Sequence, residues 1–143
     1  MTQSVSVERQ ISASASDIFA LLQDPARHTD FDGSGTVMSS KDGGTQLGLG
    51  SKFGMSMKLG PMPYRISSKV VEFEQDRLIA WAHFGKHRWR YELEPNDDGT
   101  LVRETFDWST AIVPKFIEVA GFPKKHPEAM EATLERLAKL VEG

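Results

Sequence analysis

The chain has 143 residues, of which 39% are hydrophobic and 26% are charged, and its formal net charge is −3. This composition is typical of a globular domain, and a chain of this length can bury a real core. Because there is no cysteine, a disulfide scaffold, a thiolate zinc site and a thiol nucleophile are excluded. The basic residues are scattered along the sequence, so we expect no strong electrostatic signature for nucleic acid or an anionic membrane.

The N-terminal residues, MTQSVSVERQIS, lack the apolar core of a signal peptide. No stretch approaches the roughly 18 consecutive apolar residues that a membrane span requires. We therefore expect neither secretion nor stable membrane insertion, and a cytoplasmic location is the default. There is no repeat, low-complexity tract or linker, so residues 1–143 are expected to form one domain.

The first part of the chain predicts a strand, helical turns and a hairpin. Residues 4–11 alternate apolar and polar side chains, as a half-buried strand does. A short helix follows, capped by Ser14 or Ser16, and then a second turn or helix. Further strands are expected at 36–40 and 52–59, with a glycine-rich connection between them.

The second part predicts several antiparallel strands, from about residue 64 to residue 109, and one long helix. Pro127 is a suitable first residue for that helix. The resulting order of elements is typical of an α+β fold with antiparallel hairpins. The helix has one apolar face, formed by Met130, Leu134, Leu137 and Val141.

One hairpin predicts which side chains face the interior. A loop at residues 96–99 places Tyr91 opposite Glu104 and Trp89 opposite Phe106. The same register pairs opposite charges on the other face of the two strands, as is typical of a solvated surface. Both faces therefore favour one register.

The preceding hairpin leaves two possibilities. A two-residue turn at 85–86 would mix aromatic and charged side chains on one face, whereas a three-residue loop at 84–86 separates them. We favour the longer loop. The register of residues 64–74 against the next strand stays open, because both faces of that segment are partly apolar. The favoured loop gathers on one face Ile79, Trp81, His83, His87, Trp89, Tyr91 and Leu93.

This inner face is too broad and too aromatic for a single helix to cover, which favours an internal pocket. The methionines of the third strand suit an adaptable pocket wall, although they would serve equally well in an ordinary core. The residues predicted to line the pocket are Trp81, Trp89, Tyr91, Phe106, Trp108, Met55, Met57, Tyr64 and Leu134.

Glu104 is the sharpest candidate for chemistry. A carboxyl group on an aromatic inner face should be desolvated, which raises its pKa and suits a general acid or base. The plainer alternative is a structural glutamate that accepts a hydrogen bond from the Tyr91 hydroxyl.

Two histidines, His83 and His87, are candidate proton shuttles. They lie near the end of a hairpin, so exposed or simply hydrogen-bonded rings are the alternative. The remaining histidines, His28 and His126, are distant in sequence, and we expect no metal site and no cofactor.

Two other motifs have plainer explanations. Asp30 and Asp32 lack the further acidic positions of an EF-hand loop and suit a turn. The glycines of DGGTQLGLG lack the following Gly-Lys-Ser/Thr string of a phosphate-binding loop, and they predict hairpin turns.

Four segments together resemble one bacterial family: VERQISASASDIFALLQDPARHTDFDGSG, KVVEFEQDRLIAWAHFGKHRWRYELEP, TLVRETFDWS and AMEATLERLAKLVE. They are similar to the polyketide cyclase/dehydrase and lipid-transport family of the START-like, birch-allergen-like (SRPBCC) superfamily, especially its actinobacterial members. The resemblance implies a helix-grip fold, in which a seven-stranded antiparallel sheet wraps around a long C-terminal helix and encloses a deep cavity. It implies no catalytic residue, because the family has no invariant catalytic motif.

The leading hypothesis is a protein, monomeric or homodimeric, that holds a hydrophobic or aromatic small molecule, such as a lipid, an isoprenoid or a polyketide. The alternative is a polyketide cyclase or dehydratase that uses Glu104 with His83, His87 or Tyr91. A weaker third hypothesis is a protein-interaction or chaperone-cofactor role for the exposed face of the sheet.

Overall fold

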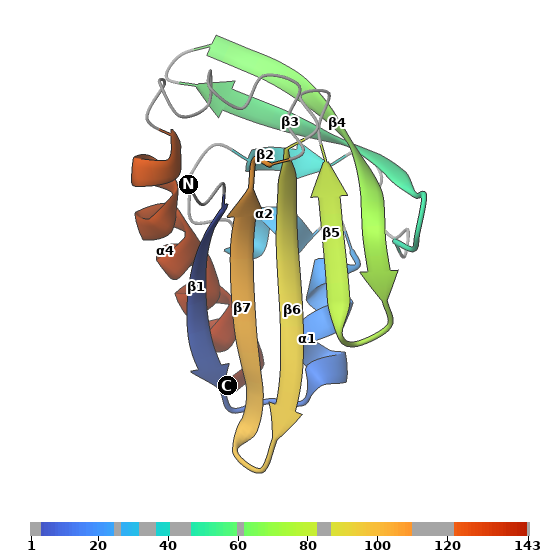
Figure 1. Ribbon diagram of the computed structural model, residues 1–143. Coiled ribbons are helices and arrows are strands. Elements are labelled where there is room, and N and C mark those ends of the chain that lie inside the picture. Colours follow the sequence, from blue (N-terminus) through green and yellow to red (C-terminus); the bar gives the residue numbers. More distant parts are fainter. Residues whose placement is uncertain are drawn as a thin grey trace.

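The computed structural model describes residues 4–24, 27–31, 37–40, 47–59, 62–82, 87–109 and 122–142. Over these ranges the chain forms a seven-stranded antiparallel sheet in the order β1-β7-β6-β5-β4-β3-β2. The helices lie on one side of the curved sheet, with α4 beside β1 (Figure 1). The strands are β1 (Ser4–Ile11), β2 (Val37–Ser40), β3 (Lys52–Leu59), β4 (Met62–Glu74), β5 (Leu78–Ala82), β6 (Arg88–Asn96) and β7 (Gly99–Asp107), and the helices are α1 (Ala15–Leu22), α2 (His28–Phe31) and α4 (Phe122–Glu142).

Helix α1 begins where its sequence provides a cap. The hydroxyl oxygen of Ser14 accepts a hydrogen bond from the backbone N–H of Asp17 at 3.2 Å, which satisfies one of the helix's first amide groups. Of the two serines considered, Ser14 is therefore the N-cap. Ile18, Phe19 and Leu22 of the helix are buried, and Leu21 is partly buried.

Both predicted hairpin registers are confirmed. In the β6–β7 pair Tyr91 lies opposite Glu104 and Trp89 lies opposite Phe106. In the β5–β6 pair Trp81 lies opposite Trp89, as the three-residue loop requires. The loop itself, residues 83–86, lies outside the described residues.

The register that the sequence left open is explained by an irregularity in β4. Val70 lies opposite Trp81 and Phe73 lies opposite Ile79, with a register shift between Val70 and Glu72. One extra residue in a strand reverses the alternation, so positions three apart share a face. Both faces of this segment therefore look partly apolar in the sequence.

Helix α4 begins at Phe122, so the expectation that Pro127 opens it is wrong. Proline inside a helix removes one backbone hydrogen bond, and its ring crowds the carbonyl group four residues earlier. Pro127 lies in the second turn, so the disturbance is confined to the start of the helix. The predicted apolar face is buried at Met130, Leu134 and Leu137. Its packing against the sheet offsets the local loss. Among the described helices, none is both long and apolar enough to cross a membrane.

Candidate functional site

Strands β5, β6 and β7 turn a continuous set of rings toward the interior. The ring centroids of Trp89 and Phe106 are 4.7 Å apart, and those of Phe106 and Trp108 are 5.7 Å apart. Trp81 and Tyr91 have centroids 5.5 Å apart. The structure thus brings together five of the residues predicted to bind a ligand. We call them the aromatic band: Trp81, Trp89, Tyr91, Phe106 and Trp108.

Helix α4 covers this band. Leu134, only 1% exposed, belongs to the same buried cluster as Trp81 and Tyr91. Met130 belongs to a second cluster with Phe106 and Trp108. Trp89 is half-buried and packs against both clusters, so it is the most exposed member of the band.

Glu104 lies on the same face as the band and is 3% exposed. In the sheet it stands opposite Val7 of β1 and Tyr91 of β6. Val102 and Phe106, the next residues of β7 on this face, are also buried. Its carboxyl group therefore lies in a largely apolar part of the interior, as expected from the sequence.

His87 lies at the end of this surface, immediately before β6. Its ring centroid is 5.4 Å from that of Phe106, with the planes at 64°. Burial lowers the pKa of the His87 imidazole below its ordinary value, because the charged form loses hydration. The neutral ring, which can accept a proton, is therefore favoured near pH 7. His83, the other candidate shuttle, lies outside the described residues.

Three further predicted ligand-binding residues lie in the neighbouring strands β3 and β4. Met57 stands opposite Tyr64, and Met55 stands opposite Ile66. Their side chains are not among the parts that the structure describes. Their place in the ligand site remains a prediction.

His28 belongs to this interior, although no pattern along the chain placed it there. Its imidazole stacks on Trp81 with centroids 4.9 Å apart and planes at 22°. Phe53 and Phe31 meet the same ring edge-on, at 5.5 Å and 5.4 Å. The Nε2 atom lies 3.0 Å from the carbonyl oxygen of Leu22, and since a carbonyl only accepts, Nε2 carries the proton.

One signal for His28 was present in the sequence. It stands three residues after Pro25, where α1 has ended and the chain must turn back over the sheet. A histidine at such a turn can donate to one of the last carbonyls of a helix, which otherwise lack partners. Its stacking on Trp81, more than fifty residues away, has no counterpart in any local pattern.

A separate open groove of about 630 Å³ lies among the turns at one end of the sheet. It is bounded by the start of α1, by the β4–β5 turn and by the β6–β7 turn. Its lining contains none of the predicted site residues. The lining is formed by Ala13, Ser14, Ala15, Ser16, Gln75, Asp76, Arg77, Pro95, Asn96, Asp97 and Gly99.

Metal-binding groups do not gather within the described ranges. There, no three histidine, aspartate or glutamate side chains lie close enough together to hold one metal ion. Asp30 falls in the four-residue helix α2, whereas Asp32 lies outside the described residues.

Solved structures with this fold come from several bacteria. Protein CV1439 from Chromobacterium violaceum superimposes with a TM-score of 0.78 over 98% of both chains, at 16% sequence identity. The AHSA1-like protein from Aeromonas hydrophila superimposes with a TM-score of 0.66 over 97% of this chain and 92% of its own, at 18% identity. At such identities the similarity shows the fold alone.

The sequence comparisons are closer. The uncharacterized protein Rv0088 of Mycobacterium tuberculosis is 41% identical over 139 residues, which are 94% of this chain. The chain spans 62% of that relative's length. The family model described as polyketide cyclase / dehydrase and lipid transport matches residues 2–142. With this match over nearly its whole length, and with the fold that the resemblance implied, the chain belongs to the polyketide cyclase / dehydrase and lipid transport family.

Proposed function

We propose that this protein binds a hydrophobic or aromatic small molecule, of lipid, isoprenoid or polyketide type, between the inner face of the sheet and α4. The observation that carries the proposal is the aromatic band, which combines five large rings on one concave face with a buried carboxyl group, Glu104, beside them. Sites for apolar ligands are lined by such rings, with few polar groups to orient the ligand. Membership of a family that includes lipid transport supports the same proposal.

Trp89 is the residue with which to test it. Because Trp89 is the most exposed member of the band, a smaller side chain there alters the contact surface with the least damage to the core. The exposed Glu94 of the same strand offers a control that leaves the inner face intact.

The experiment is a titration of the full chain with a fluorescent fatty acid and with an environment-sensitive naphthalene dye, alongside native mass spectrometry of the gently purified protein. We expect Trp89→Leu to weaken probe binding at least about tenfold, the loss of one large apolar contact. Glu94→Gln should bind as the parent does. A parent protein that takes up neither probe and carries no co-purified lipid would contradict the proposal.

A second candidate function, a cyclase or dehydratase, is favoured by one specific observation. A buried carboxyl group, Glu104, and an imidazole whose pKa burial lowers, His87, stand at the same aromatic surface. Such a pair could remove a proton from a carbon next to a carbonyl and return one to a leaving hydroxyl.

This candidate is tested with the non-titrating variants Glu104→Gln and His87→Gln on synthetic poly-β-ketone substrates. If the candidate is right, each variant lowers kcat by roughly a hundredfold or more while probe binding changes little. If both variants turn over every accepted substrate at the parental rate, Glu104 and His87 have no catalytic role and the binding function stands alone.

A further inference from the structure

The β3–β4 hairpin has an unusual distribution of charge. The chain as a whole has a net charge of −3, yet no aspartate or glutamate occurs between Asp42 and Glu72. Four basic residues fall within this interval and all of them belong to the hairpin. They are Lys52, Lys58, Arg65 and Lys69.

The register places these cations on one face. Lys52 lies directly opposite Lys69, and both side chains are exposed. In the same uninterrupted ladder Lys58 and Arg65 occupy positions of the same parity, since Ser56 pairs with Arg65 and Lys58 pairs with Pro63. Because side chains alternate along a strand, all four positions belong to the outer face of the sheet.

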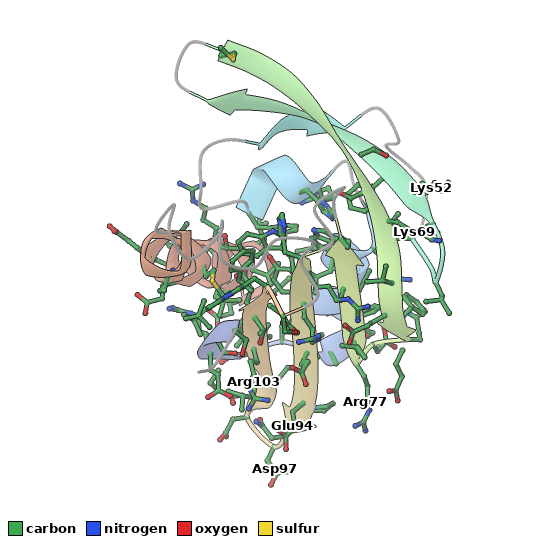
Figure 2. All side chains as sticks on the ribbon, turned by 45° about the horizontal axis from the view of Figure 1, so that its top comes forward. Lys52, Lys69, Arg77, Glu94, Asp97 and Arg103 are labelled. Carbon is green, nitrogen blue, oxygen red and sulfur yellow. The ribbon has the colours of Figure 1, made fainter. Side chains whose placement is uncertain are left out.

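The pairing of Lys52 with Lys69 is unfavourable in the isolated chain. Like charges directly opposite each other on neighbouring strands repel. Neither ammonium group has an ion-pair partner among the described residues. Figure 2 shows the two side chains close together on β3 and β4.

On the neighbouring part of the same face, the basic side chains form ion pairs. Arg88 and Arg90 both donate to the carboxylate of Glu72, at 2.8 Å to 3.0 Å, and Arg90 also reaches Asp107 at 3.2 Å. Two cations are thus balanced by two anions there. On the described part of this face, the positive charge that stands without a counter-ion belongs to the hairpin.

Exposed apolar side chains stand at both ends of the same hairpin. Three large hydrophobic residues are exposed among those that the structure describes, and two of them are Leu49, just before β3, and Met62, at the start of β4. Their exposed fractions are 69% and 65%. Met62 pairs with Leu59 and so has the register parity of the inner face, whereas Leu49 stands at the end of the hairpin that carries Lys52 and Lys69. Cationic side chains beside an exposed apolar one are the combination that binds the interface of an anionic bilayer.

We propose that the β3–β4 hairpin docks the protein on a membrane surface rich in anionic phospholipid headgroups. Lys52 and Lys69 hold the headgroup phosphates, and the positions of Lys58 and Arg65 extend the same positive face. Leu49, at the end of the hairpin where this lysine pair stands, enters the boundary of the acyl region. An anion bridging Lys52 and Lys69 removes their mutual repulsion. The scattered spacing of basic residues in the sequence concealed this surface, because antiparallel pairing brings residues 17 positions apart face to face.

The charges at the opposite end of the sheet favour one orientation of the protein on an anionic membrane. Glu94 and Asp97 lie there, far from Lys52 and Lys69 (Figure 2). The nearby Arg103 is engaged with Glu8 at 2.6 Å. One further exposed cation, Arg77, stands at this end (Figure 2), where the carboxylates of the two turns, with Asp76 and Asp98, outnumber it. An anionic surface repels this end and attracts the hairpin, so the molecule would meet a membrane with β3 and β4 first.

The test is co-sedimentation of the full chain with vesicles of phosphatidylcholine containing about one third phosphatidylglycerol, a content that gives a strongly negative surface. We expect binding to these vesicles at low salt, a marked loss at high salt, and little binding to pure phosphatidylcholine. Lys52→Gln/Lys69→Gln should weaken the partition coefficient by about tenfold or more. Leu49→Ser should weaken it by a few-fold at every salt concentration, since that contact is apolar.

The matched control is Arg77→Gln/Lys139→Gln, which removes the same charge from two exposed positions outside the hairpin. It should bind vesicles nearly as the parent does. Equal loss in both double variants would mean that only net charge matters and would overturn the proposal. Tighter binding to duplex DNA than to anionic vesicles, or no vesicle binding by the parent, would also overturn it.

The docking surface is independent of what the interior holds. Uptake of the fluorescent fatty acid by Lys52→Gln/Lys69→Gln should equal that of the parent, because both lysines lie on the outer face. Failure of vesicle binding therefore leaves the proposed ligand site standing, and failure of probe uptake leaves the docking surface standing.

Discussion

The imidazole of His28 lies flat against the indole of Trp81, with ring centroids 4.9 Å apart and planes inclined by 22°. The contact joins α2 to the central strand β5, while the Nε2–H of the same ring donates to the carbonyl oxygen of Leu22 at the end of α1. One buried side chain thus links both short helices to the aromatic band. The ring of Trp81 is therefore held in place by His28, which belongs to helix α2 and not to the sheet.

Replacing His28 by alanine should lower the free energy of unfolding by about 2–4 kcal/mol, since it leaves a cavity beside Trp81 and an unmet carbonyl at Leu22. His28→Phe keeps an aromatic ring and should cost less, about 1–2 kcal/mol, mainly for the lost hydrogen bond. Urea denaturation measures both. Lys139→Ala, on the exposed side of α4, should stay within about 0.5 kcal/mol of the parent. A change for His28→Ala as small as that control's would disprove the anchoring role.

Gly99, which opens β7, makes a sharper stability prediction. Its φ is +130°, and a Cβ added there would lie 2.2 Å from the carbonyl oxygen of Ile11. Gly99→Ala must therefore displace the end of β1, and we expect a loss of about 3 kcal/mol or more, or failure to fold.

Two other glycines distinguish the steric clash of an added Cβ atom from the strain of a positive φ. Gly50 has a φ of +84° and open space for 4 Å around the position of an added Cβ, so Gly50→Ala isolates backbone strain and should cost about 1–2 kcal/mol. Gly48 has the same open space and no positive φ, so Gly48→Ala should be nearly neutral. Melting temperatures of the three variants should fall in the order Gly99→Ala, Gly50→Ala, Gly48→Ala, from lowest to highest. Any other order would contradict this assignment of clash and strain.

Much of the fold could be predicted because its information is local. Alternation along β6 and β7 predicted the pairing of Tyr91 with Glu104, since a shift by one residue would have moved aromatic side chains of one strand to the charged face of the other. The same reasoning predicted the register of β5 against β6 once the longer loop was chosen. It could not predict the register of β4, because the irregularity beside Val70 reverses the alternation without any local signal in the sequence.

The site could be predicted only as far as strand periodicity reaches. Four rings of the aromatic band share a face because they alternate in three strands, and Trp108 follows directly after β7. His28 was missed because it meets Trp81 through the packing of a helix on a sheet, a contact that depends on the positions of both elements. The cation pair Lys52–Lys69 was likewise invisible until the register of β3 and β4 was known.

The ion pairs of Glu72 predict a loss of stability in acid. A hydrogen bond from Arg90 is the main reason why the pKa of Glu72 lies below its ordinary value, and it outweighs the opposing effect of burial. Burial alone would raise the pKa of Asp107, but hydrogen bonds from Ser109 and Arg90 together hold it below its ordinary value. Both carboxylates therefore stabilise the fold at neutral pH.

A lowered pKa gives stability that is complete above the unfolded-state value, about 4 to 4.5 for these groups, and is lost as the pH falls through the folded-state value. The free energy of unfolding should thus decline as the pH falls below about 4.5. Glu72→Gln should cost about 1–2 kcal/mol at pH 7 and show a shallower decline in acid. Denaturation by urea at a series of pH values tests this. An unchanged slope in the variant would exclude Glu72 as a source of the acid sensitivity.

His87 makes the last prediction, at milder pH. Desolvation lowers the pKa of its imidazole below the value of about 6.5 that histidine has in an unstructured peptide, so the unfolded chain binds a proton more readily than the folded one. The stability that this difference provides is complete above about pH 6.5 and is lost as the pH falls toward the folded-state pKa. His87→Gln, which does not titrate, should abolish this part of the pH dependence. An NMR titration of the His87 ring should give a midpoint below that of a reference peptide. A midpoint at or above the reference value would show that the ring is hydrated. The basis for a proton-accepting imidazole beside Phe106 would then be lost.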